Sequence, residues 1–394
     1  MNAYIDKLYP YPFERLDKLF AGIRPPEGKL ISLSIGEPRH EPPDFVINAF
    51  KEALQTAASQ YPVSRGRADL RQACSRWLQR RFAATVCPES EILPVNGTRE
   101  GLFSLVQALV TPGDCPAVVM PNPFYQIYEG AALLAGAEPV YLDTTEETGF
   151  LPDLDAVKPA TWERTALFFA CSPGNPTGAV MDEAYWSRVI ELADKYDFII
   201  AADECYADIY TGAAPPSLLE VCARQGRTNF DRCIAFHSLS KRSNIPGLRS
   251  GFVAGDRQLM QRFLAYRTYH GCAMPVATQI ASIAAWDDDD HVLENRRLYA
   301  RKFAEVTPRL AEVFDVREPD AAFYLWPRIP MDTEEFTRRL YADAGVIVLP
   351  GSYLSRRTSA GDPAQGRLRI SLVASVEDCV SAAEAMVELA GRMT

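Results

Sequence analysis

The sequence predicts an α/β protein in which a large domain, built on a mostly parallel seven-stranded sheet, is joined to a smaller α+β domain. Between residues 90 and 260, short apolar runs bounded by Gly, Pro, Asn or Asp recur seven times, as in strands covered on both faces. Helix-like stretches separate several of these runs, and strands that alternate with helices form parallel sheets. The length of 394 residues exceeds what one compact core usually supports, which predicts the second domain.

The expected strands and helices of the large domain follow one another in a regular order. Strands are expected at residues 92–97, 117–121, 137–143, 165–172, 198–204, 233–240 and 250–256. Helices are expected at residues 99–110, 124–135 and 182–196. In the last helix, apolar residues recur at helical spacing: Ala184, Trp186, Val189, Ile190 and Ala193.

The character of the chain changes after Trp286. Residues 287–290 are four aspartates in a row, which indicates a solvated turn. There follow a charged helix at 294–313, short strands at 322–326 and 345–349, a Gly/Ser/Arg-rich loop at 351–366, a strand at 367–372 and a closing helix. We therefore expect an N-terminal arm with part of the small domain at 1–49, the large domain at 50–286 and the small domain at 287–394.

Composition and charge exclude several classes of function. The net charge of −10 argues against nucleic acid or an anionic membrane as the main partner. No apolar stretch approaches the roughly 20 residues of a membrane span, and the first residues lack the apolar run of a signal peptide, so we expect a cytoplasmic protein. The nine cysteines are scattered without a CxxC pair, and the four histidines do not cluster. Neither disulfides nor a metal site is therefore expected.

The most informative candidate residue is Lys241, which follows an expected strand in CIAFHSLSKRSNIPGLRSG. Open α/β sheets bind their ligands at the carboxyl ends of strands. A lysine considered alone is ordinarily a surface cation. Ser238, Ser240 and Arg249 change that expectation, because two hydroxyl donors and one bidentate cation suit a phosphate dianion.

A second candidate, Asp203, follows five apolar residues in FIIAADECYADIY, so its carboxylate is expected near the end of a buried strand. A buried carboxylate needs a cation or hydrogen-bond donors. A helix N-cap or a core salt bridge would meet that need, and so would the protonated nitrogen of a pyridine ring. Tyr206, three residues further on, is placed to donate to a phenolic oxygen of such a ring.

Two further turns supply polar and aromatic groups at the same edge of the sheet. In CSPGNPTG, Asn175 offers an amide donor within an ordinary turn sequence, and the bond before Pro176 is a candidate cis peptide. In PNPFYQIYE, Tyr125 is either a ring that stacks on a planar ligand or a packed aromatic at a helix start.

A third turn, VNGTREGLF, lies where a strand ends and a helix begins. The free backbone N–H groups of Gly97, Thr98 and Arg99 point at any anion bound there. The turn is neither GxGxxG nor a Walker loop, so nucleotide binding has little support. An N-cap at Thr98 would explain the same residues.

Taken in order, these motifs resemble the class I and II aminotransferases, which are fold-type I enzymes with pyridoxal 5'-phosphate as cofactor. The order is GTR, PFYQIY, NPTG, DECY, SLSKxxxxPGLRSG and RIS, and the match runs over nearly the whole chain. The resemblance implies that Lys241 carries the cofactor covalently as an imine and shuttles the proton. It also implies roles for the other residues: Asp203 pairs with the pyridine nitrogen, Asn175 and Tyr206 bond the O3′ oxygen, Tyr125 stacks on the ring, and Gly97, Thr98, Arg99, Ser238, Ser240 and Arg249 hold the phosphate.

The same resemblance implies substrate anchors and a partner. Arg369 in GRLRISL matches the arginine that binds the substrate α-carboxylate, with Asn175 beside it. Gly36 in SLSIGEPRHEPP matches the glycine whose backbone approaches that carboxylate. Tyr61 in QYPVSRGRADLR matches a tyrosine that reaches the phosphate in the neighbouring subunit, so a homodimer with shared active sites is expected.

Several stretches resemble the succinyldiaminopimelate aminotransferases of lysine biosynthesis more closely: LYPYPFERLDKL, IGEPRHEPPDFV, SKRSNIPGLRSGFVAGD and YRTYHGCAMPVATQ. This resemblance implies N-succinyl-LL-2,6-diaminopimelate as amino donor and 2-oxoglutarate as acceptor. Their additional carboxylates require cations beyond Arg369. Arg39 and Arg242 are the candidates, and a solvent-facing position is the alternative for each.

Other functions remain open within the same fold. One is a class I aminotransferase specific for aspartate, aromatic amino acids or LL-diaminopimelate, and another is a pyridoxal-phosphate lyase that eliminates or decarboxylates. A DNA-binding regulator with an aminotransferase-like domain is disfavoured, because that domain begins within the first ~50 residues and the charge is acidic.

Overall fold

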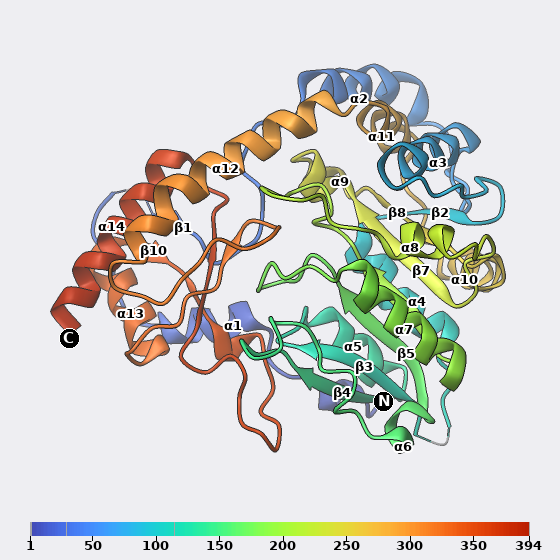
Figure 1. Ribbon diagram of the computed structural model, residues 1–394. Coiled ribbons are helices and arrows are strands. Elements are labelled where there is room, and N and C mark those ends of the chain that lie inside the picture. Colours follow the sequence, from blue (N-terminus) through green and yellow to red (C-terminus); the bar gives the residue numbers. More distant parts are fainter. Residues whose placement is uncertain (1, 29, 114, 394) are drawn as a thin grey trace.

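The computed structural model describes residues 2–28, 30–113 and 115–393, and a seven-stranded sheet forms its centre (Figure 1). All seven predicted runs are confirmed as strands of this sheet: β2 Ile92–Val95, β3 Ala117–Asn122, β4 Glu138–Asp143, β5 Thr165–Cys171, β6 Ile199–Asp203, β7 Cys233–Ser238 and β8 Gly251–Gly255. The strand order is β2-β8-β7-β6-β5-β3-β4. β8 runs antiparallel to both of its neighbours, and the other pairs are parallel.

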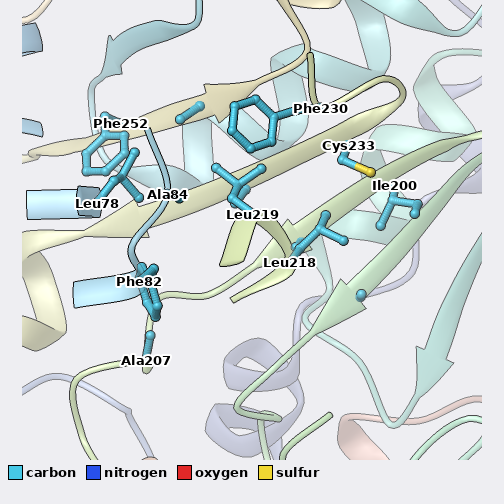
Figure 2. Close-up of a cluster of buried hydrophobic side chains, with 14 of the residues drawn as sticks. Leu78, Phe82, Ala84, Ile200, Ala207, Leu218, Leu219, Phe230, Cys233 and Phe252 are labelled. Atoms are coloured by element: carbon cyan, nitrogen blue, oxygen red, sulfur yellow. The ribbon is translucent and has the colours of Figure 1, made fainter. Parts of the chain in front are cut away.

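Helices cover both faces of the sheet, which explains why its strands are apolar throughout. One core contains residues of α2 Asp44–Ala57, α3 Ala68–Phe82, α6 Pro159–Trp162, α7 Glu183–Tyr196, α8 Leu218–Arg224 and α11 Val276–Asp287. Figure 2 shows where α3, α8 and the sheet meet in this core, with Leu78, Phe82, Leu218, Leu219, Ile200 and Phe252. The opposite core contains residues of α4 Thr98–Leu109, α5 Ile127–Leu134 and α10 Arg257–His270.

A separate apolar core lies in the C-terminal part of the chain. It joins α12 Asp290–Leu310, α13 Thr333–Ala344 and α14 Val376–Met393 to an antiparallel sheet of β11 Leu349–Pro350, β12 Leu368–Ser371 and β9 Tyr324–Leu325. From the N-terminal part, β1 Ile31–Ser32 pairs in parallel with β10 Val346–Ile347, and α1 Pro12–Leu19 packs nearby. The C-terminal core is separate from the two cores that flank the large sheet, which indicates two units, and the division at residues 49 and 286 remains a prediction. In the described ranges, no helix combines the length and apolar character needed to cross a membrane.

The acidic run at residues 287–290 is the turn between α11 and α12, and three of its four aspartates are exposed, as predicted, but the run also makes charged contacts. Asp287 pairs with Arg76 at 2.7 Å, and Asp289 lies 2.6 Å from a guanidinium nitrogen of Arg242. Helix α12 begins at Asp290, four residues earlier than predicted. The aspartates therefore form the junction at which α11, α12 and α3 are held together by charge.

Arg242 is wrong as a candidate for binding substrate and also as a solvent-facing residue. Its side chain is 3% exposed and pairs with Asp208 at 2.9 Å and with Asp289. It also donates to the backbone carbonyls of Ala285 and Asp288, at 2.6 and 2.9 Å. Burial tends to raise the pKa of Asp208, but Arg242 and Arg81 bring that pKa below its usual value. Arg242 is thus a structural anchor next to Lys241.

Replacement of Arg242 by Ala is expected to lower the free energy of unfolding by about 3 kcal/mol, because buried carbonyls lose their donor and Asp208 loses one of two cations. Arg76→Ala is the matched control, because its exposed pair with Asp287 contributes only about 0–1 kcal/mol. Urea denaturation of both cofactor-free variants measures the difference. Equal losses in the two variants would contradict this account of Arg242.

Candidate active site

A cavity of about 430 Å³ lies at the carboxyl ends of β5, β6 and β7, between the large sheet and the C-terminal core. It brings together most of the residues selected from the sequence: Gly36, Thr98, Arg99, Tyr125, Asn175, Asp203, Tyr206, Ser238, Ser240, Lys241, Arg249 and Arg369. Parallel strands place their carboxyl ends at one edge, which is why motifs far apart in the sequence converge here. Tyr11, Glu37 and Tyr324 also line the cavity.

Lys241 lies on the short helix α9 Leu239–Arg242, which starts directly after β7. The chain turns there because the Ser238 hydroxyl accepts a hydrogen bond from the backbone N–H of Ser240 at 3.1 Å. The Lys241 amine donates to the backbone oxygen of Gly36. Desolvation in the cavity lowers the pKa of Lys241 to about 8, and the positive charge of Arg369 acts in the same direction. Lys241 is therefore able to lose a proton near neutral pH.

Asp203 is the last residue of β6 and is only 4% exposed. The Tyr128 hydroxyl donates to its Oδ2 at 2.6 Å, and the Cys205 backbone N–H donates to Oδ1 at 3.3 Å. In the described part of the chain, no lysine, arginine or histidine nitrogen lies within 4.0 Å of this carboxylate. Burial raises the pKa of Asp203, although the hydrogen bonds from Cys205 and Tyr128 and the charge of Lys241 act in the opposite direction, so a cation in direct contact would further stabilise the charged carboxylate.

Arg369 on β12 extends from the C-terminal core into the cavity. Its guanidinium donates to Asn175 Oδ1 at 3.1 Å and to the Ser34 backbone oxygen at 2.6 Å, while its buried Nε has no hydrogen-bond partner. Buried polar groups are rarely left unpaired, and Arg369 lines the cavity, so its guanidinium is placed to bind a ligand there. A guanidinium with a free edge is suited to a carboxylate.

Tyr206 and Tyr324 join the two sides of the cavity through their hydroxyl groups, which lie 2.7 Å apart. A side chain at Gly36 would collide with this arrangement, because a Cβ there would lie 2.2 Å from the Tyr324 hydroxyl oxygen. Neither Tyr324 nor Tyr128 was selected from the sequence. Tyr128 lies three residues after Tyr125, a helical spacing that indicates a shared face, but Tyr324 carries no local signal.

The opposite end of the cavity has the features of an anion site. Helix α4 starts at Thr98, and the preceding Gly97 has a φ of 77°, which side chains rarely adopt. A Cβ at Gly97 would also lie 2.2 Å from an Arg249 nitrogen. The Arg249 guanidinium donates to the Pro246 backbone oxygen at 2.8 Å and has no carboxylate partner among the described residues. The free N–H groups of α4 and a guanidinium without a carboxylate partner suit a phosphate.

Two selected side chains lie outside the cavity. Arg39 is exposed and does not line it, which places it away from the position expected for a distal carboxylate. Tyr61 is fully exposed, so within one subunit it touches no part of the site. Arg99, selected only for its backbone N–H, lines the cavity, and its guanidinium carbon lies 5.4 Å from the centre of the Tyr11 ring.

One group of metal-ligating types lies close together, contrary to the argument from histidine spacing. Ligand atoms of Glu100, His270 and Cys272 lie within 4.8 Å of one another. Arg267 pairs with Glu100 and donates to the Cys272 backbone oxygen at 3.0 Å. A guanidinium thus already provides positive charge to this group.

The sequence model of the aminotransferase class I and II family matches residues 28–386. The chain belongs to this family. Its cofactor is accordingly pyridoxal 5'-phosphate, and the protein is a pyridoxal-phosphate-dependent aminotransferase that acts on amino acids and 2-oxo acids.

Individual relatives match over almost the whole chain. An LL-diaminopimelate aminotransferase of Nitratidesulfovibrio vulgaris (strain DSM 19637 / Miyazaki F) is 35% identical over 378 residues, 94% of each chain. The crystal structure of an aminotransferase from Neisseria meningitidis has a TM-score of 0.94 and 50% identity, covering 99% of this chain and 100% of that one. A probable N-succinyldiaminopimelate aminotransferase from Thermus thermophilus has a TM-score of 0.85 and 27% identity, covering 96% and 99%.

The residues present fit the cofactor of the family. Asp203 is a buried carboxylate without a cation, and a protonated pyridine nitrogen would supply one. The helix start at Thr98 and Arg249, which has no carboxylate partner among the described residues, suit a phosphate at the other end. Tyr125 lines the cavity between these two ends of the donor set. An aromatic side chain there suits the face of a planar ring.

The lowered pKa of Lys241 predicts its reactivity in the cofactor-free protein. We expect an amine-specific reagent to modify Lys241 with a midpoint near pH 8, whereas a lysine in a model peptide reacts around its pKa of about 10.4. The neutral amine is the reactive form, so a lower pKa moves the midpoint to lower pH. Peptide mass spectrometry across a pH series measures it, and the cofactor-loaded protein, in which Lys241 should be protected, is the control. A midpoint above pH 10 would contradict the burial argument.

Proposed function

We propose that this aminotransferase transfers the amino group of N-succinyl-LL-2,6-diaminopimelate to 2-oxoglutarate, a step of lysine biosynthesis by the diaminopimelate route. This proposal rests on the presence of two cations in one cavity. They are Arg369, whose Nε has no hydrogen-bond partner, and Arg99, which also lines the cavity. The acceptor and the donor each have an α-carboxylate and at least one further carboxylate. A substrate of this kind needs two separate cationic contacts.

Lys241 is the residue to which we assign proton transfer. With a pKa of about 8, its amine can take the proton from the Cα of the amino donor. It can later deliver a proton to the Cα of the amino acid that forms from the acceptor. Asp203 would hold the proton on the pyridine nitrogen, and bound pyridoxal phosphate then supplies the electron sink that makes the Cα proton removable. Arg369 would orient the substrate by its α-carboxylate, so that the Cα–H bond faces Lys241.

The remaining assignments follow the same geometry. Asn175 and Tyr206 would contact the ring oxygen, since both line the cavity near Asp203. Tyr125 would cover one face of the ring. The phosphate would lie against Thr98, the Arg99 backbone, Ser238, Ser240 and Arg249, and Gly97 would keep the space for Arg249.

LL-Diaminopimelate is the second candidate donor. The curated relatives at 31–35% identity are named LL-diaminopimelate aminotransferases. Glu37 also lines the cavity, and its carboxylate would complement the distal ammonium of that donor. N-succinylation removes this ammonium and adds a carboxylate, so Arg99 favours the first donor and Glu37 favours the second.

The active enzyme is proposed to be a homodimer in the cytoplasm. Tyr61 and Tyr269 are large aromatic side chains that are 100% and 96% exposed in the single chain, and both are expected to be covered. Arg249 is exposed as well, so the phosphate end of the cavity is open on one side. In a dimer, Tyr61 would complete the phosphate site of the neighbouring subunit.

A donor screen with 2-oxoglutarate tests the substrate proposal. We expect glutamate formation with N-succinyl-LL-2,6-diaminopimelate at a kcat/KM at least about tenfold above that with LL-diaminopimelate, because one added or lost charged contact contributes about 1.4 kcal/mol or more. Lys241→Ala is the control and should form no glutamate from either donor. A reversed preference would replace the first donor by the second and leave the family assignment intact.

The proposed contact between Arg99 and the distal carboxylate of the substrate is tested by comparing Arg99→Ala with Arg39→Ala. Loss of the Arg99 guanidinium should raise KM for 2-oxoglutarate about tenfold or more, because the γ-carboxylate loses a charge-assisted hydrogen bond. Arg39 lies outside the cavity, so its removal should change KM less than about twofold. Steady-state kinetics with both substrates decide the matter. The opposite pattern would return the distal carboxylate to Arg39.

A further inference from the structure

Lys302, on the inner face of α12, is a buried amine without a carboxylate partner. The residue is 1% exposed, and within the described ranges no acidic side chain lies within 4.0 Å of its Nζ. The Nζ lies 2.6 Å from His40 Nε2 and donates to the Leu372 backbone oxygen at 3.1 Å. The Tyr299 ring centre is 5.0 Å away. Burying an unpaired ammonium destabilises a protein, so its presence needs a reason.

The hydrogen bonds from Lys302 to His40 and from His40 to Asn295 share one donor-to-acceptor direction. An ammonium only donates, so His40 accepts at Nε2 and carries its hydrogen on Nδ1. His40 then donates to Asn295 Oδ1 at 2.7 Å. Burial lowers the pKa of His40 to about 4, and the Lys302 charge acts in the same direction. The His40 ring therefore stays neutral, as this series of hydrogen bonds requires.

Asn295 connects these hydrogen bonds to the backbone of the turn that carries Lys241. Its amide nitrogen donates to the carbonyl oxygens of Lys241 and Arg242, at 3.2 and 3.3 Å. The Asn244 amide donates to Asn295 Oδ1 at 3.1 Å, which fixes the orientation of the Asn295 amide. These two carbonyls belong to α9, a four-residue helix with few hydrogen bonds of its own. Asn295 therefore holds the turn that presents Lys241.

The hydrogen-bond relay formed by Lys302, His40 and Asn295 connects three segments that carry the substrate site. His40 lies in the segment after β1, four residues beyond Gly36, and Leu372 lies three residues beyond Arg369 at the end of β12. Asn295 and Lys302 are seven residues apart, so they share one face of α12. Figure 1 shows this helix, in orange, extending from the helices beside the large sheet to the C-terminal core.

We propose that Lys302, His40 and Asn295 are positioning residues that fix Lys241 relative to the substrate carboxylate site. The inference rests on the proton-transfer role proposed for Lys241 and extends it to side chains that touch neither substrate nor cofactor. The relay acts on the main chain at both ends: on Lys241 through Asn295, and on the Arg369 strand through Leu372. Loss of any link leaves both anchors present while their relative position becomes less well defined.

The first test uses Lys302→Met in the cofactor-loaded enzyme. The rate constant for the half-reaction with the amino donor, followed by stopped-flow absorbance of the cofactor, should fall at least about tenfold. The dissociation constant of glutarate, a dicarboxylate without an amino group, should change less than about threefold, because Arg369 and Arg99 remain in place. Lys302→Arg keeps a buried donor and should restore the rate to within about threefold of wild type.

Arg301→Met is the matched control, because Arg301 is exposed on the outer face of the same helix. It should leave the half-reaction unchanged. A second readout uses the cofactor-free protein: in Asn295→Leu, the midpoint of Lys241 modification should rise by about half a pH unit or more, since a looser turn admits water to the amine. A merely structural role for Asn295 would lower thermal stability and leave this midpoint at the wild-type value.

Three results decide the proposal. A wild-type half-reaction rate in Lys302→Met overturns it, and so does a loss that Lys302→Arg fails to restore. If Lys302→Met does not fold, His40→Leu replaces it, since leucine neither accepts from Lys302 nor donates to Asn295, and a wild-type rate there overturns the relay. Transamination by Lys241→Ala would instead refute the proposed function itself, so the two failures are distinguishable.

Discussion

The buried carboxylate of Asp203 sets the arrangement of the whole cavity. At the end of β6 its carboxylate accepts hydrogen bonds from Tyr128 and a backbone N–H, but the described chain places no cationic nitrogen within 4.0 Å of it. Such a group is stable in its charged form only when a positive charge arrives from outside the chain. The pyridine nitrogen of the family's cofactor would provide that charge, which would explain why an apolar strand ends in an acid here.

Strand register then determines where the other groups lie. In the parallel sheet Asp203 stands level with Cys171 on β5 and Phe236 on β7. Asn175 follows Cys171 by four residues and Lys241 follows Phe236 by five, so both extend past the sheet edge on either side of the carboxylate. A slip of one residue would turn these side chains to the opposite face of the sheet. The apolar cores on the two faces therefore protect the register on which the chemistry depends.

This geometry explains which features the sequence predicts. The strands were found because burial on both faces leaves uninterrupted apolar runs, and Lys241, Asp203 and Asn175 were found because they follow such runs directly. The buried position of Arg242 and its pair with Asp289 were not predicted, since an ion pair over 47 residues leaves no local pattern. Tyr324 was missed for the same reason: its partner Tyr206 is 118 residues away. Local signals locate strand ends, whereas long-range polar contacts become visible only in three dimensions.

Three buried cations show how the fold separates support from function. Arg242 is fully compensated, with two carboxylates and two carbonyls, and it fixes the junction of α9, α11 and α12. Arg369 has partners on two of its nitrogens but an unpaired Nε beside the cavity. Lys302 has only neutral partners, and the chain of donors that begins there ends on the carbonyls of the Lys241 turn. Among these three, the fully paired Arg242 supports the fold, whereas Arg369 and Lys302, which are incompletely paired, contact the site or the backbone that carries it.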